Sequence, residues 1–306
     1  MRMRERAALC LLLQMAVSWL VWMTQHRMQP GAQAAFAEAG YVFSVEIAPD
    51  TPLPSPTGTP EQTASPAPEP TPSLPAEDTA MRVEVIRATA PPPAWVGKRV
   101  LIYHTHTWEA YEQVEDAPYR ETEKWRTKDN TCNVVAVGDA LAAAMTALGL
   151  TVVHDTTAFE PPNLDDAYAR SLTMLEARAS AGEHYDLYID LHRDALAATS
   201  TIRRTVEIGG LECARFMVLV GKGTTGGYEE KPDWEANLLI AQRITSGLNG
   251  QQEGLARDVK IKTGRFNQHV APCCVLIECG VNTNTLEQVL NGVPYLAQAI
   301  ADALAE

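Results

Sequence analysis

The segment "KRVLIYHTHTWEAY", Lys98–Tyr111, changes character within a few residues. Its first half, "RVLIY", is apolar and rich in strand-forming residues, so it predicts a buried β-strand. His104, His106 and Glu109 follow as soon as the strand ends. Imidazole and carboxylate groups at such a position are either incidental to a loop or bind a metal ion, and the other strands of the chain favour the metal ion.

Strands and helices alternate along the rest of this region. Apolar spacing predicts strands over 150–156, 185–195, 213–221 and 273–280. It predicts helices over 133–149, 164–180 and 233–249, with a closing pair of helices over 285–304. This alternation is typical of an α/β fold. We therefore expect a single domain with a largely parallel, mixed sheet flanked by helices on both faces.

The sequence before this domain is of a different kind. Residues 1–24 read as an N-terminal membrane anchor or signal, because Arg2, Arg4 and Arg6 precede an uncharged apolar run over 7–23. Residues 25–94 read as an extracytoplasmic Pro-rich linker, since half of the chain's 20 prolines lie between Pro49 and Pro75. Residues 95–306 form the predicted catalytic domain. We expect a single-pass protein of the cell membrane with this domain outside the cytoplasm, and a cleaved, secreted form is the alternative.

Composition excludes several classes of function. The net charge of −13 and the pI near 5.0 argue against nucleic acid as the main partner, because phosphate binding needs clustered Lys and Arg. The six cysteines include no CxxC pair, so neither a zinc knuckle nor a regular disulfide framework is indicated.

Three predicted strands end in residues that can do chemistry. The first supplies the histidines and glutamate already named, the "DLHRD" strand supplies His192, and the "LIECG" strand supplies Glu278. The carboxyl ends of parallel strands meet at one edge of a sheet. Two histidines and a carboxylate with an open fourth position are the ligand set of a catalytic zinc site, and a further, unbound carboxylate can serve as general base and acid. His104 and His106 are two residues apart, so one could bind the metal while the other forms a hydrogen bond behind it.

Seven strings in order carry a family resemblance: "VLIYHTHTWEAY", "VVAVGDALAAAM", "HDTTAF", "AYARSL", "DLHRDA", "GRFNQH" and "VLIECGVNTNTLEQ". Together with the anchor and the Pro-rich spacer, they resemble the stage II sporulation protein P family. That family is related in fold to the zinc-dependent N-acetylmuramoyl-L-alanine amidases. The resemblance implies a cell-wall hydrolase that acts on peptidoglycan during engulfment in spore formation. It also implies a lytic transglycosylase partner like stage II sporulation protein D, among other engulfment proteins.

The resemblance also implies roles for individual residues. His106 and His192 match the two histidine ligands of the amidases, and Glu278 matches their catalytic glutamate. The amidases take a third ligand from a glutamate at the start of the first helix, where this chain has Asn133. We assign the third position to Glu109, with His104 as the runner-up. The reaction implied is hydrolysis, by zinc-activated water, of the amide between N-acetylmuramic acid and L-alanine of the stem peptide.

Four further residues are candidates for binding substrate. Arg193 follows the second histidine ligand and could meet a stem-peptide carboxylate or form a structural ion pair. Arg265, Asn267 and Gln268 form a polar loop before the last strand, which is either a peptide-binding loop or a structural turn. Two other functions remain open: a protein that is mainly an endopeptidase of peptide cross-links, and a non-catalytic scaffold that binds the cell wall.

Overall fold

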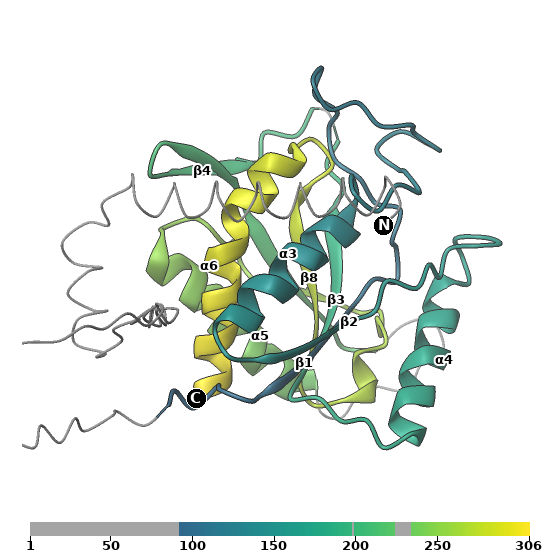
Figure 1. The fold of residues 1–306 in the computed structure, drawn as a ribbon, viewed down its shortest axis with the longest axis vertical. Coiled ribbons are helices and arrows are strands. Elements are labelled where there is room, and N and C mark those ends of the chain that lie inside the picture. The colour runs from purple at the N-terminus through teal and green to yellow at the C-terminus, as the bar shows by residue number, and fades with distance from the viewer. Residues whose placement is uncertain (1–91, 198, 224–233) are drawn as a thin grey trace, which may run out of the picture. The chain divides into compact units, whose positions relative to one another are not determined.

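A six-stranded mixed sheet organises residues 92–197, 199–223 and 234–306, which are the residues that this computed structural model describes (Figure 1). The strand order is β2-β1-β3-β8-β6-β7. The strands are β1 (Arg99–Tyr103), β2 (Thr151–His154), β3 (Leu187–Asp194), β6 (Phe216–Gly221), β7 (Lys260–Lys262) and β8 (Cys274–Val281). The four helices are α3 (Val134–Ala147), α4 (Ala167–Ser180), α5 (Trp234–Gln251) and α6 (Leu286–Ala305), with a short 3-10 helix, η1 (Gln268–Val270).

The pairing is largely parallel, as the sequence predicts. β1 pairs in parallel with β2 and β3, and β3 pairs in parallel with β8. β6 is antiparallel to β8 and parallel to the edge strand β7. The predicted fold class, a mixed α/β sheet flanked by helices, is confirmed.

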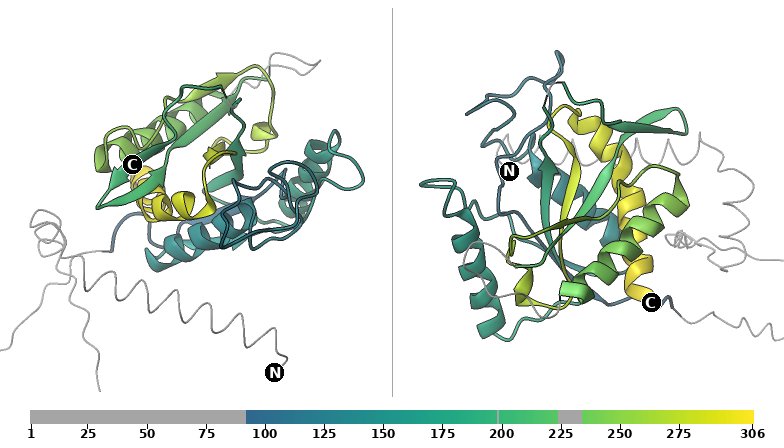
Figure 2. Two further views of the ribbon diagram at one scale, coloured as in Figure 1. Left: turned by 90° about the horizontal axis from the view of Figure 1, so that it is seen from above. Right: turned by 180° about the vertical axis from the view of Figure 1, so that it is seen from behind.

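Helices cover both faces of the sheet. Alternate residues of the strands, such as Ile102, Ile189 and Ile277, belong to one large core cluster with residues of α3, α5 and α6. The opposite face carries a smaller cluster in which Leu101 and Tyr103 pack with Leu175 of α4. Figures 1 and 2 show α3 and α6 lying together while α4 stands apart from them. The second face is therefore less covered, and it is the face on which the polar strand residues lie.

Two parts of the predicted chain path need correction. The closing pair of helices is one continuous helix, α6, which runs through Pro294. Its apolar stripe, including Val289, Val293 and Leu296, stays buried along the whole length, and this packing outweighs the local cost of a proline. The strand predicted over 213–221 is two strands, and its first part pairs in an antiparallel hairpin, β4 (Thr205–Ile208) with β5 (Leu211–Ala214).

The predicted anchor over 1–24 and most of the linker over 25–94 lie outside the described residues. Within the part of the chain that is described, no helix combines the length and the apolar character needed to span a membrane.

Candidate metal and catalytic site

His106 and His192 approach each other at the carboxyl ends of β1 and β3. His192 lies within β3, and His106 lies in the loop that follows β1. Their ring centroids are 5.4 Å apart and their planes are nearly perpendicular. With metal–nitrogen bonds near 2 Å, two imidazoles on one zinc ion have centroids roughly 5–6 Å apart. The two rings are thus close enough to share one ion.

Glu278 lies beside them on the next strand. His192 and Glu278 are directly paired residues of β3 and β8, so their side chains lie on the same face of the sheet. The Oε2 atom of Glu278 is buried and has no hydrogen-bond partner. Burial raises the pKa of Glu278 to about 8. A carboxyl group of this kind can exchange a proton near neutral pH.

Glu109 lies on the other side of His192. Its Oε2 atom is 3.3 Å from Nδ1 of His192 and accepts a hydrogen bond of 3.1 Å from the backbone N–H of Arg193. Burial alone would raise the pKa of Glu109, but the charges of His192 and Arg193 and the contact with His192 lower it to about 2. Glu109 is therefore a carboxylate held against a histidine ring.

The backbone places Glu109 at the start of the first helix of the domain. Its carbonyl oxygen accepts a 2.9 Å hydrogen bond from the N–H of Val134, the first residue of α3. Asn133 is the N-cap of that helix: its side chain accepts from the N–H of Val135. Asn133 thus caps the helix, and the bond from Val134 holds the backbone of Glu109 beside the start of α3.

His104, the runner-up for the third ligand, is engaged elsewhere. It is fully buried, with Nδ1 at 2.8 Å from the carbonyl oxygen of Leu191 and Nε2 at 2.8 Å from Nε2 of His154. Burial, with a contribution from His154, lowers the pKa of His104 to about 3. Both ring nitrogens already have partners within the protein, so the structure gives His104 a structural role.

Arg193, for which the sequence predicts a substrate contact, forms side-chain hydrogen bonds within the protein. The pairing of β3 with β8 shifts register between His192 and Asp194, and Arg193 lies in this bulge. It is only 8% exposed, and its guanidinium donates to the carbonyl oxygens of Ala110 and Trp125. Arg193 fastens the loop that carries Glu109, and the ion pair considered as the alternative is not what it forms.

The polar loop before β8 is built into the fold. Gln268 is fully buried and links to β6, accepting from the N–H of Gly221 and donating to the carbonyl of Leu219. Asn267 donates from its side chain to the carbonyl oxygen of Tyr168 at 2.7 Å. These two residues therefore act as a structural turn. Arg265 is half-buried, and its contact with substrate stays a prediction.

Three further residues of the site have no role predicted from the sequence. Asp190 lies two residues before His192, with Oδ1 at 2.9 Å from Nε2 of His192; the alternation of β3 could have revealed it, because residues two apart share a face. Glu160 is buried, contacts the guanidinium of Arg126 and lies 3.6 Å from Nδ1 of His106. Tyr168 packs edge-on against His106 at 5.6 Å between centroids. Glu160 and Tyr168 belong to segments distant in sequence, and no local pattern marks them.

The donor types at this site suit a zinc ion. His106, His192 and Glu109 provide two imidazoles and a carboxylate, and Nδ1 of His192 already lies 3.3 Å from Oε2 of Glu109. Within the described ranges, however, no three His, Cys, Asp or Glu side chains already stand in the arrangement of a finished metal centre. The types of side chain at this site therefore suit a zinc ion.

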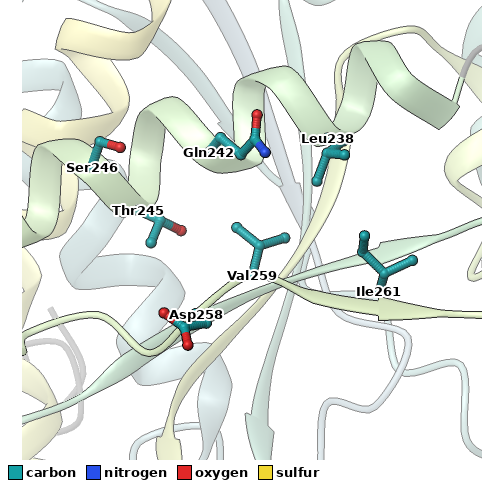
Figure 3. A pocket seen from close by; sticks show the side chains of 7 residues that line it. All are labelled: Leu238, Gln242, Thr245, Ser246, Asp258, Val259 and Ile261. Carbon is teal, nitrogen blue, oxygen red and sulfur yellow. The ribbon is translucent and has the colours of Figure 1, made fainter.

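A separate pocket lies away from these residues. It has a volume of about 300 Å³ and lies between α5 and the edge strand β7 (Figure 3). Asp258 is the one ionisable residue among those that line it, and none is a histidine. None of the residues that line this pocket belongs to the site at the strand ends.

Comparison with known proteins gives a family and a loose structural likeness. No curated protein matches the chain. Among solved structures, the N-acetylmuramyl-L-alanine amidase Ami1 from Mycobacterium smegmatis is 17% identical, with a TM-score of 0.39 over 69% of this chain and 96% of that one. The N-acetylmuramoyl-L-alanine amidase from Clostridium difficile 630 is 14% identical, with a TM-score of 0.42 over 68% and 94%. The CwlD amidase from Clostridioides difficile, solved in complex with the GerS lipoprotein, is 16% identical, with a TM-score of 0.41 over 68% and 95%.

The sequence profile of one family covers most of the chain. It matches residues 67–301, which include every site residue described above. The chain therefore belongs to the stage II sporulation protein P family.

Proposed function

We propose that this protein is a zinc-dependent peptidoglycan hydrolase that cleaves the amide between N-acetylmuramic acid and the L-alanine of the stem peptide. The observation that carries the proposal is the convergence of His106, His192 and Glu109 with the unpartnered carboxyl group of Glu278. Membership of the stage II sporulation protein P family supports a role in hydrolysing the cell wall.

His106, His192 and Glu109 would hold the zinc ion. When bound, zinc acts as a Lewis acid that activates a water molecule and polarises the scissile carbonyl. The bulge at Arg193 keeps Glu109 against His192, since the backbone N–H of Arg193 donates to the Glu109 carboxylate. The guanidinium of the same residue holds the following loop at Ala110.

Glu278 would move the proton. Its Oε2 atom has no partner within the protein, so it is free to accept a proton from the attacking water and to deliver that proton to the leaving nitrogen of L-alanine. Burial raises the pKa of Glu278 to about 8, so near neutral pH the ionised fraction accepts the proton, and the raised pKa favours its retention between the two transfers. A fixed ion pair would have kept the group permanently ionised.

The test is the action of the full-length protein on purified peptidoglycan, followed by mass spectrometry. We expect the wild type to release stem peptides that begin with L-alanine and to leave glycan bearing free lactyl carboxyl groups. Glu278→Gln should bind zinc as the wild type does and lose at least about 100-fold in rate, as expected for removal of a general base. Glu176→Gln, a change at an exposed position of α4, is the matched control and should leave the rate unchanged.

Other product patterns would contradict the proposal. Stem peptides that remain on the glycan but lose their cross-links would indicate an endopeptidase. Binding to the cell wall with no release of product by the wild type would indicate a scaffold. Release by Glu278→Gln at the wild-type rate would remove Glu278 from the mechanism.

Location and partners extend the proposal. The uncharged run over 7–23, preceded by three arginines, supports a membrane tether with the catalytic domain outside the cytoplasm. Membership of the family supports action during spore formation. We extend the proposal to a lytic transglycosylase partner like stage II sporulation protein D. Protease added to intact protoplasts should digest a C-terminal tag, and protection of the tag would contradict this orientation.

A further inference from the structure

A fully buried carboxylate lies behind His192. Asp190 has no exposed surface, and Thr105 donates to both of its oxygens: the backbone N–H to Oδ1 at 2.8 Å and the hydroxyl to Oδ2 at 2.7 Å. A buried carboxylate is costly unless its lone pairs are satisfied. Two hydrogen bonds from one residue fix the orientation of this carboxylate.

The same hydroxyl continues into a longer polar chain. Oγ1 of Thr105 lies 3.0 Å from Oγ of Ser171 on α4, and the side-chain amide of Asn267 donates to that Ser171 oxygen at 3.0 Å. Asn267 also holds the carbonyl of Tyr168 in the first turn of α4. Thr105, Ser171 and Asn267 are all at least nine-tenths buried. The loop before β8 is thus connected through α4 to the carboxylate of Asp190.

The loop that makes this connection has an unusual backbone conformation. Phe266 and Asn267 have backbone φ angles of 49° and 52°. These lie in the left-handed region, which residues other than Gly and Asn seldom adopt. Phe266 packs edge-on against Tyr168 at 5.9 Å between centroids. Such conformations persist where the surroundings determine them, and here they point Asn267 at Ser171.

At its other end the chain meets a ring of the candidate site. Oδ1 of Asp190 lies 2.9 Å from Nε2 of His192, while Nδ1 of His192 faces Glu109 at 3.3 Å. The contact with Asp190 is a close ion pair whose N–H is not well aligned on the oxygen, since Nε2 lacks a hydrogen bond of good geometry. A carboxylate on one ring nitrogen of a histidine fixes the tautomer and leaves the other nitrogen to bind.

We infer that Asp190 is a positioning residue: it holds the proton of His192 on Nε2, so that Nδ1 is presented toward Glu109, and Thr105, Ser171 and Asn267 hold Asp190 in place. The inference rests on the proposed function where it concerns zinc. The "GRFNQH" loop thereby helps to fix the position of a proposed metal ligand, His192. Burial alone would raise the pKa of Asp190, but His192 and the donors of Thr105 lower it, which is consistent with an ionised partner.

The decisive variant is Asp190→Asn in the full-length protein, with two readouts. Competition with a chelator gives the dissociation constant for Zn²⁺, and we expect it to rise 10- to 100-fold, the usual effect of removing such a partner. Long-range ¹H–¹⁵N correlation spectra of the zinc-free protein report on each ring nitrogen of His192 separately. We expect the Nε2 resonance to shift more than that of Nδ1, which still faces Glu109. A purely structural role would lower stability without moving either readout in the folded protein.

The control and a second variant keep the test sharp. Asp186→Asn, at a carboxylate paired with Lys98 before the start of β3, should leave zinc affinity and the His192 spectrum unchanged. Thr105→Val removes one donor to Asp190 and should weaken zinc binding in the same direction; it decides the matter if Asp190→Asn does not fold. Wild-type zinc affinity in folded Asp190→Asn and Thr105→Val would overturn the inference.

Failure of the proposed function would look different. If the wild type binds no zinc, the metal centre is contradicted, and the spectra alone decide the positioning role. An unchanged Nε2 resonance in Asp190→Asn would then overturn it, and a shifted one would support it.

Discussion

His192 and Glu278 are directly paired residues on the neighbouring parallel strands β3 and β8, and their side chains share one face of the sheet. The pairing brings a histidine that already contacts Glu109 and Asp190 next to a buried carboxyl group with no partner for Oε2. Burial raises the pKa of this group from 4.5 to about 8. The native state therefore retains a proton that the unfolded chain loses.

This difference in pKa between the native and unfolded states predicts that Glu278 destabilises the native state more as the pH rises. Between pH 4.5 and about 8 the unfolded chain binds fewer protons at this position than the native state does, so Glu278 lowers the free energy of unfolding as the pH rises. With a chelator present, Glu278→Gln should gain stability relative to the wild type from pH 5 to pH 8, by on the order of 1 kcal/mol or more. Urea unfolding measured across this range checks the prediction. Parallel curves for the two proteins would contradict it, and Glu176→Gln should parallel the wild type.

The third ligand can be decided by separating metal affinity from stability. Glu109→Gln keeps the size of the side chain but removes the charge that faces His192, so we expect zinc affinity to fall at least about 10-fold. His104→Gln disturbs the buried contacts with Leu191 and His154, so we expect it to cost about 1–3 kcal/mol of stability while the folded protein binds zinc within about threefold of the wild type. Chelator competition and urea unfolding on both variants make the comparison. The reverse pattern would make His104 the ligand.

The buried contact between His104 and His154 depends on a glycine of α3. A Cβ atom at Gly138 would lie 2.4 Å from Nε2 of His154 and 2.8 Å from Nε2 of His104. Gly138→Ala must therefore separate rings that now stand 2.8 Å apart between nitrogens, and we expect a loss of about 1–3 kcal/mol despite the better helix propensity of alanine.

Gly250 in α5 is the matched control for Gly138. A Cβ atom there would meet nothing within 4 Å, so Gly250→Ala should raise stability by about 0.5–1 kcal/mol. Denaturant midpoints for the two variants should move in opposite directions. A stabilising Gly138→Ala would show that the two histidine rings are not held in contact.

The family resemblance, and not the pattern, selected His106. Sequence patterns placed His192, Glu278 and the pair His104 and His106 at strand ends, because parallel strands end at one edge. They could not separate Glu109 from His104, since both follow the same strand. The difference lies in the partners of His104, Leu191 and His154, which come from other strands.

The β4–β5 hairpin and Asp190 differ in how far the sequence signals them. The β4–β5 hairpin turns through Gly209 and Gly210, both with positive φ, and a Gly-Gly pair between short strands is a recognisable hairpin signal. Asp190 shares a face with His192, but its role depends on Thr105 and on Ser171 of α4. Those contacts are set by packing between elements, which periodicity within one strand does not report.

Asn133, the N-cap of α3, offers a test of whether the start of this helix takes part in metal binding. Its Oδ1 atom caps α3 by accepting from Val135, and its amide donates to the carbonyl of Thr127 at 3.1 Å and to Asn130 at 3.2 Å. Asn133→Ala should therefore cost about 0.5–2 kcal/mol in stability. Asn133→Ser keeps the cap and should recover part of that loss. Because the side chain of Asn133 is used in the cap and Glu109 is the proposed carboxylate ligand, we expect both variants to bind zinc with wild-type stoichiometry in a chelator titration. Loss of zinc from folded Asn133→Ala would return Asn133 to the metal site.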